Sequence, residues 1–108
     1  MNIIIRTKNT TLDSALEIFI NEKIGSLEKL LGAGPVEARV EIGLPSKHHR
    51  SGPIFYAEVN LKIGGRLLRA TSEGEDLRVA IVDVKNELQA EIKKFKEKSK
   101  DRARKPKQ

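Results

Sequence analysis

The chain contains no cysteine and no tryptophan, and only four of its 108 residues are aromatic. Without cysteine, disulfide bonds, thiol catalysis and cysteine-ligated zinc are excluded. The four rings, Phe19, Phe55, Tyr56 and Phe95, are too few for the base-stacking surfaces that bind single-stranded nucleic acids. These absences leave charge and shape as the main means by which this chain could recognise a partner.

Long apolar segments are missing as well. No apolar run is long enough to cross a bilayer, and the N-terminal sequence Met-Asn-Ile-Ile-Ile-Arg lacks the basic region and long apolar stretch of a signal peptide. We therefore expect a cytoplasmic protein without a membrane partner. A length of 108 residues with 38% hydrophobic content predicts one domain with a modest core.

Positive charge is concentrated at the C-terminal end. Residues 93–108 contain nine basic and two acidic residues, whereas the other ninety-two contain twelve basic and thirteen acidic residues, so the end carries +7 and the remainder −1. Such an end attracts a polyanion by releasing its counterions. A solvated tail that keeps the protein soluble is the alternative. We predict a domain over residues 1–98 and a basic, flexible tail over 99–108.

Hydrophobic spacing predicts six elements. Residues 3–5 are β-branched and predict a short strand. Apolar residues at three- and four-residue spacing predict a helix that begins after Thr11 as N-cap, holds Asp13 in its first turn, and ends near Leu31. Period-two alternation predicts strands over 36–44, 55–63 and 66–71, with a tight turn at Gly64-Gly65. A second helix follows the acidic stretch 73–76 and continues to about Ser99.

Two amphipathic helices cannot bury their apolar stripes alone, so both should cover one face of the sheet. We predict an α+β fold of order β-α-β-β-β-α, with a four-stranded sheet and two helices packed on one face, similar to a double-stranded RNA-binding domain. The outward face of the sheet mixes charges of both signs and is expected to be solvated.

Charges on the second helix are sorted by face. At roughly 100° per residue, a basic stripe and an acidic stripe lie on different sides of the helix. The basic stripe contains Arg78, Lys85, Gln89, Lys96 and Lys100, and the acidic one contains Asp76, Asp83, Glu87 and Glu91. Such a basic stripe could follow a phosphate backbone over roughly 30 Å. A surface helix decorated by weak ion pairs is the alternative.

Enzyme chemistry finds little support. His48 and His49 are adjacent in the polar loop 45–53, where they point apart, and no other His or Cys could complete a metal site. They form no set of nucleophile, base and orienting group. We expect no enzymatic activity and no cofactor. Together with Lys47 and Arg50, the histidines offer four neighbouring donors to RNA phosphates, or they are simply solvated loop residues.

Several short motifs follow this order of elements. They are Glu22-Lys23…Leu27-Glu28-Lys29, Gly65…Leu68-Arg69-Ala70 and Gly74-Glu75-Asp76-Leu77…Ala80-Ile81…Leu88…Lys94…Lys96…Lys98. Over about residues 2–98, their order and spacing resemble the ribosome hibernation promoting factor and ribosome-associated inhibitor A family, short type.

The resemblance implies a protein that binds the small ribosomal subunit in the channel between head and body. There it overlaps messenger RNA and tRNA, inhibits translation by steric exclusion, and protects idle ribosomes under stress. The resemblance also implies ribosomal RNA contacts through both helices, at positions matching Lys23, Lys29 and Lys94. Lys23 adjoins the buried stripe, so a helix-edge lysine whose stem covers apolar surface is the alternative.

The chain also departs from the family pattern. Many relatives have Tyr-Ala-Ala-Ile-Asp where this chain has residues 78–82, and they often have Lys, Arg or Gln at positions 87, 90 and 91. Basic residues on a neighbouring face would compensate. The predicted RNA-binding set is Lys23, Lys29, Lys47, Arg50, Arg78, Lys85, Lys93, Lys94, Lys96 and Lys98. Longer relatives carry a second domain that pairs ribosomes, so this chain is expected to be monomeric and not to pair ribosomes by itself.

Three alternatives remain open at this point. The first is a general double-stranded RNA module without preference for ribosomes. The second is a metal-dependent nuclease built on His48, His49 and a carboxylate. The third is a protein–protein adaptor that uses the acidic stripe.

Overall fold

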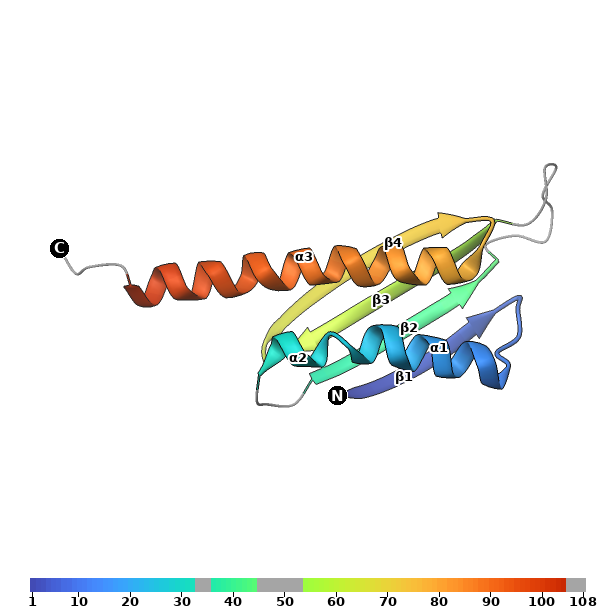
Figure 1. Ribbon diagram of the computed structural model, residues 1–108, viewed down its shortest axis with the longest axis horizontal. Coiled ribbons are helices and arrows are strands. Elements are labelled where there is room, and N and C mark those ends of the chain that lie inside the picture. Colours follow the sequence, from blue (N-terminus) through green and yellow to red (C-terminus); the bar gives the residue numbers. More distant parts are fainter. Residues whose placement is uncertain (33–35, 45–53, 105–108) are drawn as a thin grey trace.

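The computed structural model describes the backbone of residues 1–32, 36–44 and 54–104, and the side chains of these segments as far as Lys98. Figure 1 shows the arrangement of its strands and helices. The elements are β1 (Asn2–Lys8), α1 (Ser14–Gly25), α2 (Glu28–Leu31), β2 (Val36–Gly43), β3 (Phe55–Ile63), β4 (Arg66–Gly74) and α3 (Leu77–Arg104). The predicted order is confirmed, and α2 is a short continuation of the first helical segment.

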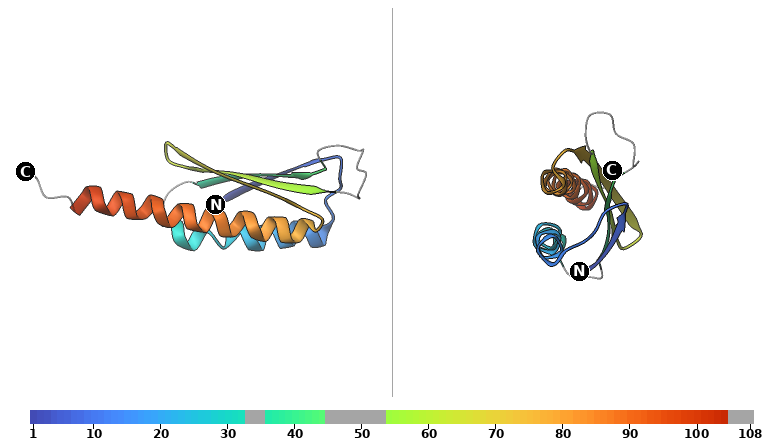
Figure 2. Two further views of the ribbon diagram at one scale, coloured as in Figure 1. Left: turned by 90° about the horizontal axis from the view of Figure 1, so that it is seen from above. Right: turned by 90° about the vertical axis from the view of Figure 1, so that its right-hand side faces the viewer.

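The four strands form one mixed sheet in the order β1-β2-β3-β4. β1 pairs with β2 in parallel, and the other two pairs are antiparallel. A parallel pair cannot be joined by a tight hairpin, so the chain crosses between β1 and β2 through α1 and α2. The helices lie together on one side of the sheet, and its other side is open (Figure 2). The predicted two-layer α+β architecture is therefore confirmed.

The core lies between the helices and the inner face of the sheet. In the register between β2 and β3, Val40 lies opposite Val59, and period-two alternation turns both side chains to the inner face, where they are buried. From the helices, Ile20, Leu88 and Ile92 are fully buried against them. No buried residue among the described segments is polar or charged. Burial of this single apolar layer is what fixes both helices, and hence their exposed charges, relative to the sheet.

The first helical segment ends at Leu31 as predicted, but it differs from the prediction in its N-cap and in its continuity. Asp13, not Thr11, is its N-cap, because the Asp13 carboxylate accepts a hydrogen bond from the Leu16 N–H at 2.7 Å. The helix is also interrupted after Gly25: the Leu27 N–H bonds to the Ile24 carbonyl, three residues back, at 3.1 Å. The Ser26 hydroxyl donates a hydrogen bond to the Lys23 carbonyl oxygen at 2.7 Å, and this bond competes with the regular backbone hydrogen bonds of the helix.

Two glycines meet a specific steric demand. Gly43 pairs with Lys8 across the parallel strands, and a Cβ at Gly43 would lie 2.1 Å from the Lys8 carbonyl oxygen. Gly64, in the turn between β3 and β4, has a φ of 57°, which lies in the left-handed region that favours glycine. The first glycine permits the close approach of β1 to β2, and the second permits the tight hairpin.

Helix α3 is longer than the sheet that it covers. Asp76 starts it by accepting a hydrogen bond from the Arg78 N–H at 2.9 Å. Among its side chains as far as Lys98, the last buried one is Ile92. The Arg66 guanidinium at the β3–β4 turn lies 5.2 Å from the centre of the Phe95 ring. Beyond that point α3 projects past the sheet (Figure 1). The domain boundary expected at residue 98 falls within this helix, which continues to Arg104.

Candidate nucleic-acid interface

One flank of α3 is basic and faces α1. The Arg78 guanidinium lies 5.5 Å from the centre of the Phe19 ring in α1, which establishes the direction of this flank. Because an α-helix turns by about 100° per residue, its sequence shows which other residues lie on the same flank as Arg78. We call it the α1-facing flank, and it contains Arg78, Val82, Lys85, Gln89, Lys93 and Lys96. Within the described side chains of α3, no carboxylate occupies this flank.

Phe19 holds cations from both helices. The Lys23 ammonium, one turn further along α1, also lies 5.5 Å from the centre of the ring. Each such cation–π contact contributes about 0.5–1 kcal/mol at an exposed site. The sequence did not indicate this contact of Phe19, because its spacing placed Phe19 in the buried stripe. The only local signal was the four-residue spacing between Phe19 and Lys23, which puts both side chains on one helix face.

The opposite flank of α3 is acidic and faces β4. The Ser72 hydroxyl of β4 donates a hydrogen bond to the Asp83 carboxylate at 3.3 Å. Helical spacing places Glu87 and Glu91 on the same side. One Glu91 carboxylate oxygen is buried and has no hydrogen-bond partner within the described part of the chain. Burial raises the pKa of Glu91, the neighbouring Glu87 raises it further, and Lys94 opposes the shift.

The predicted separation of charge therefore has a structural basis: the basic side of α3 lies along α1, and the acidic side lies along β4. The second side is partly packed against the sheet. This arrangement weakens the adaptor hypothesis, because a hydrogen bond within the protein already occupies the Asp83 carboxylate.

The structure brings only some of the predicted contact residues together. Lys93 and Lys96 are exposed on the α1-facing flank, whereas Lys94 and Lys98 follow Glu91 on the β4-facing side by helical spacing. Lys29 is exposed on α2. Lys47 and Arg50, and both histidines between them, lie outside the described residues.

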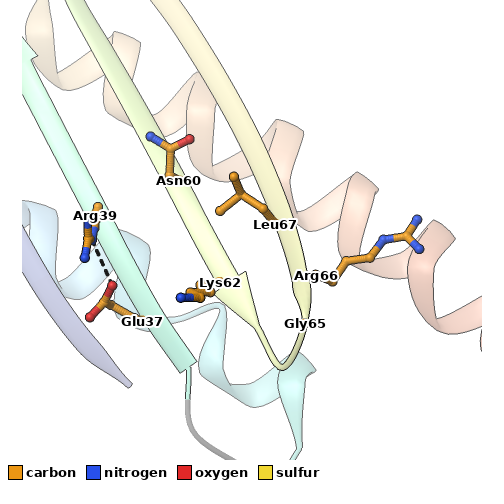
Figure 3. Close-up of a pocket in the computed structure, with 7 residues that line it drawn as sticks. All are labelled: Glu37, Arg39, Asn60, Lys62, Gly65, Arg66 and Leu67. Atoms are coloured by element: carbon orange, nitrogen blue, oxygen red, sulfur yellow. Dashed lines mark hydrogen bonds and ion pairs between the residues drawn. The ribbon is translucent and has the colours of Figure 1, made fainter.

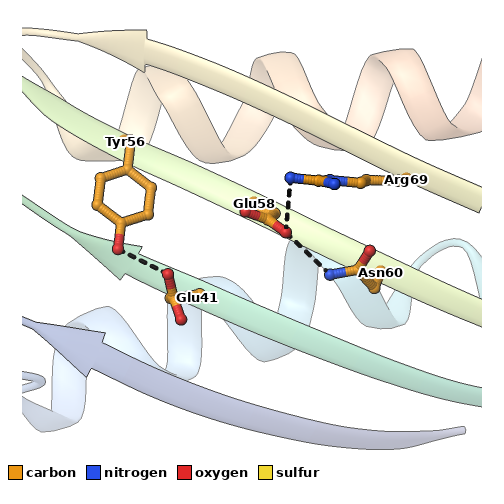
Figure 4. A network of polar contacts seen from close by, with 5 residues as sticks. All are labelled: Glu41, Tyr56, Glu58, Asn60 and Arg69. Carbon is orange, nitrogen blue, oxygen red and sulfur yellow. Dashed lines mark hydrogen bonds and ion pairs between the residues drawn. The ribbon is translucent and has the colours of Figure 1, made fainter. Parts of the chain in front are cut away.

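The open face of the sheet neutralises much of its own charge. Arg39 and Glu37 form an ion pair of 2.8 Å, and Arg69 and Glu58 form one of 3.2 Å. In the same layer, the Tyr56 hydroxyl donates to the Glu41 carboxylate at 2.7 Å (Figure 4). Burial and this hydrogen bond to an anion raise the pKa of Tyr56 to about 12.

A shallow hollow of about 340 Å³ lies on this open face near the β3–β4 turn (Figure 3). Five of the seven residues that line it are polar or charged; the lining consists of Glu37, Arg39, Asn60, Lys62, Gly65, Arg66 and Leu67. Of the three cations that line the hollow, Arg39 is paired with Glu37, and the Arg66 side chain extends away from the hollow toward Phe95. The arrangement fits the solvated surface that the sequence predicts.

The described segments lack both a metal-binding cluster and a membrane-spanning helix. The side chains of residues 1–32, 36–44 and 54–98 include no group of three or more His, Cys, Asp or Glu residues placed to hold a metal ion. No helix within those ranges combines the length and apolarity required to span a membrane.

Solved structures share this fold. The crystal structure of the Thermus thermophilus Protein Y N-terminal domain matches with a TM-score of 0.73 and 26% identity, over 88% of this chain and 99% of that one. A ribosomal subunit interface protein from Coxiella burnetii matches with a TM-score of 0.71 and 16% identity, over 89% of this chain and 98% of that one, which supports the fold alone. No curated protein sequence gave a match.

The family resemblance inferred from the sequence is confirmed by a match along most of the chain. The model of the family described as sigma 54 modulation protein / S30EA ribosomal protein matches residues 3–100. This range includes β2, β3 and β4, all of β1 except Asn2, and α3 as far as residue 100. The chain therefore belongs to the sigma 54 modulation protein / S30EA ribosomal protein family.

Proposed function

We propose that this protein is a ribosome hibernation factor that binds the small ribosomal subunit at the channel for messenger RNA and tRNA. By occupying that channel, it inhibits translation through steric exclusion and protects idle ribosomes. Family membership supports an association with ribosomes. The observation that carries the proposal is the basic α1-facing flank, which includes no carboxylate among the described side chains.

The distribution of ion pairs favours the helix side as the RNA-binding side. None of the ion pairs found among the described residues involves a cation of the α1-facing flank, whereas two arginines of the open sheet face are paired. From Arg78 to Lys96 this flank spans roughly 27 Å of helix. Cations spread over that length can contact several successive phosphates of folded RNA, and each contact releases counterions.

We assign the principal phosphate contacts to Lys23, Arg78, Lys85, Lys93 and Lys96. Lys29, Lys47, Arg50, Lys94 and Lys98 remain proposed contacts outside this group. Phosphate contacts position the protein, and complementarity to the shape of folded ribosomal RNA provides selectivity. The body measures 27 by 19 Å across its two shorter axes, so bulk alone would exclude an RNA strand from the same channel. This mechanism uses no catalytic group and no cofactor.

Sedimentation of the purified protein with small subunits through sucrose gradients tests the proposal, with translation assayed in parallel. We expect the protein to migrate with small subunits and to reduce translation at the same concentrations. If six basic residues engage phosphates, the log–log dependence of affinity on salt should have a slope of roughly −4 to −5.

A plain RNA duplex provides the matched competitor in this experiment. Equal affinity for the duplex and for the small subunit would support a general RNA-binding module instead. Failure to migrate with subunits at physiological ionic strength would contradict the proposed function altogether.

A further inference from the structure

Two cations from different helices converge on a single aromatic ring. Lys23 and Arg78 each lie 5.5 Å from the centre of Phe19, so their charges are separated by no more than twice that distance. Lys23 belongs to the last turn of α1, and Arg78 belongs to the first turn of α3. The ring therefore holds two like charges at the seam between the helices.

This arrangement brings positive charges together without neutralising them. Neither cation takes part in an ion pair within the described residues. The carboxylate closest in sequence to Arg78, that of Asp76, instead accepts the backbone N–H of Arg78. A ring face attracts a cation but does not cancel its charge, so both cations remain able to bind an anion. Two neighbouring like charges are most stable when an external anion lies between them.

The chemistry of the two groups indicates which anion fits. The planar guanidinium of Arg78 can donate two parallel hydrogen bonds to a phosphate, and the ammonium of Lys23 adds a mobile point charge. We infer that Lys23 and Arg78 form a clamp for one phosphate group at the α1–α3 seam, and that Phe19 is the positioning residue that holds both cations. This inference rests on the proposed function for the source of the phosphate, the backbone of ribosomal RNA.

A single shared phosphate predicts a specific salt dependence. Each phosphate contact contributes about 0.7–0.9 to the log–log salt slope of binding. Replacing both residues, Lys23→Gln with Arg78→Gln, should therefore reduce the slope by about 0.7–0.9, because only one phosphate is lost. The control pair Lys29→Gln with Lys93→Gln, whose members share no ring, should reduce it by about 1.4–1.8 if each holds its own phosphate. A reduction of that larger size in the clamp pair would overturn the shared site.

Phe19→Leu tests the positioning role, since leucine keeps an apolar side chain but removes the ring face. We expect this substitution to weaken small-subunit binding by about threefold to tenfold, comparable to the loss of cation–π contacts. In the Lys23→Gln, Arg78→Gln background it should have no further effect, because no cation remains to be held. An equal loss in both backgrounds would show a purely structural role and contradict the inference.

Titration of the wild-type protein with inorganic phosphate, followed by nuclear magnetic resonance, tests the site without any variant. Shifts at Lys23 and Arg78 that saturate before those at Arg6 and Lys62 on the open face support the clamp. Such shifts would show that the clamp binds a phosphate group whether it is free or part of an RNA backbone. Uniform, non-saturating shifts at all four cations would overturn it. If wild type does not bind small subunits at all, the proposed function fails, whereas normal binding with an unchanged slope in the clamp pair rejects the clamp alone.

Discussion

The two faces of this molecule carry similar types of residue but use them differently. On the open sheet face, carboxylates lie beside cations, as in the pairs Arg39–Glu37 and Arg69–Glu58. On the helix side, the basic flank of α3 has no carboxylate within the described side chains, and the acidic flank lies along β4 instead. A surface whose charges pair with one another within the protein remains solvated, whereas unpaired cations gathered on one surface are available to a polyanion. The placement of charge, and not its amount, therefore distinguishes a binding face from a solvated one.

The largest difference between the faces should be in folding stability. Leu88 is fully buried between α3 and the sheet, whereas Leu67 is 62% exposed on the open face. We expect Leu88→Ala to lower the free energy of unfolding by about 3 kcal/mol through lost burial and a residual cavity. The same change at Leu67 should alter it by no more than about 0.5 kcal/mol. Chemical denaturation of both variants measures this difference, and similar losses would show that the open face is packed in solution.

The second prediction concerns binding and uses the same number of charge reversals on each face. Lys85→Glu, Lys93→Glu and Lys96→Glu together should weaken small-subunit binding by about a hundredfold and reduce the salt slope by about 2–3, because three phosphate contacts are lost. Arg6→Glu, Lys8→Glu and Lys62→Glu change the net charge equally on the open face. Sedimentation across a range of salt concentrations compares the two sets.

The open-face set is expected to weaken binding by less than about threefold through the change in net charge alone. Comparable losses in both sets would mean that total charge, and not the helix flank, determines binding. Circular dichroism of both triple variants ensures that an unfolded protein is not mistaken for a weak binder.

The third prediction concerns the neutralised face itself. Tyr56→Phe removes the hydrogen bond of 2.7 Å to Glu41 and should lower the free energy of unfolding by about 1–2 kcal/mol, with no effect on small-subunit binding. Tyr56 is the only tyrosine, so the absorbance of tyrosinate reports it alone. In the folded protein that titration should have a midpoint near the raised pKa of about 12. A midpoint at the ordinary value of 10.0 would show that the bond does not persist in solution.

Much of this fold could be predicted because its periodicities are unambiguous. Alternation in the strands at 36–43 and 55–63 and the apolar stripe of α3 specified the elements and their order. The N-cap was assigned wrongly because Thr11 and Asp13 are both residues that cap helices, and only the structure shows which one reaches an N–H. The interruption after Gly25 was missed because Leu27 continues the apolar spacing across it and is buried in either case.

The sequence predicted only part of the candidate site. Helical periodicity predicted that charges on α3 are sorted, because that property depends on the helix alone. Which flank faces α1 depends on tertiary packing, and the contact between Arg78 and Phe19 became visible only in the structure. Similarly, the Tyr56–Glu41 hydrogen bond depends on the register between β2 and β3, which alternation within either strand does not specify.

The smallest effect on the free energy of unfolding is expected at Glu91, which differs most clearly from the paired acids of the open face. One of its carboxylate oxygens is buried without a hydrogen-bond partner within the described residues, and burial is the main cause of its raised pKa. A carboxyl whose pKa is higher in the folded state keeps its proton longer than in the unfolded state. Folding stability therefore falls as pH rises above the ordinary value of 4.5 and levels off above the raised pKa.

Glu91→Gln removes this ionisation, so it should raise the free energy of unfolding by about 1 kcal/mol at neutral pH. The advantage should disappear below pH 4.5, where the native glutamate is protonated in both states. Thermal unfolding across this pH range measures the effect, with exposed Glu97→Gln on the same helix as a control of identical charge change. If the two variants behave alike, the general charge of α3 and not the buried oxygen sets the pH dependence. A gain confined to Glu91→Gln would instead show that the β4-facing flank carries an uncompensated acid, in contrast to the open sheet face, where carboxylates are paired.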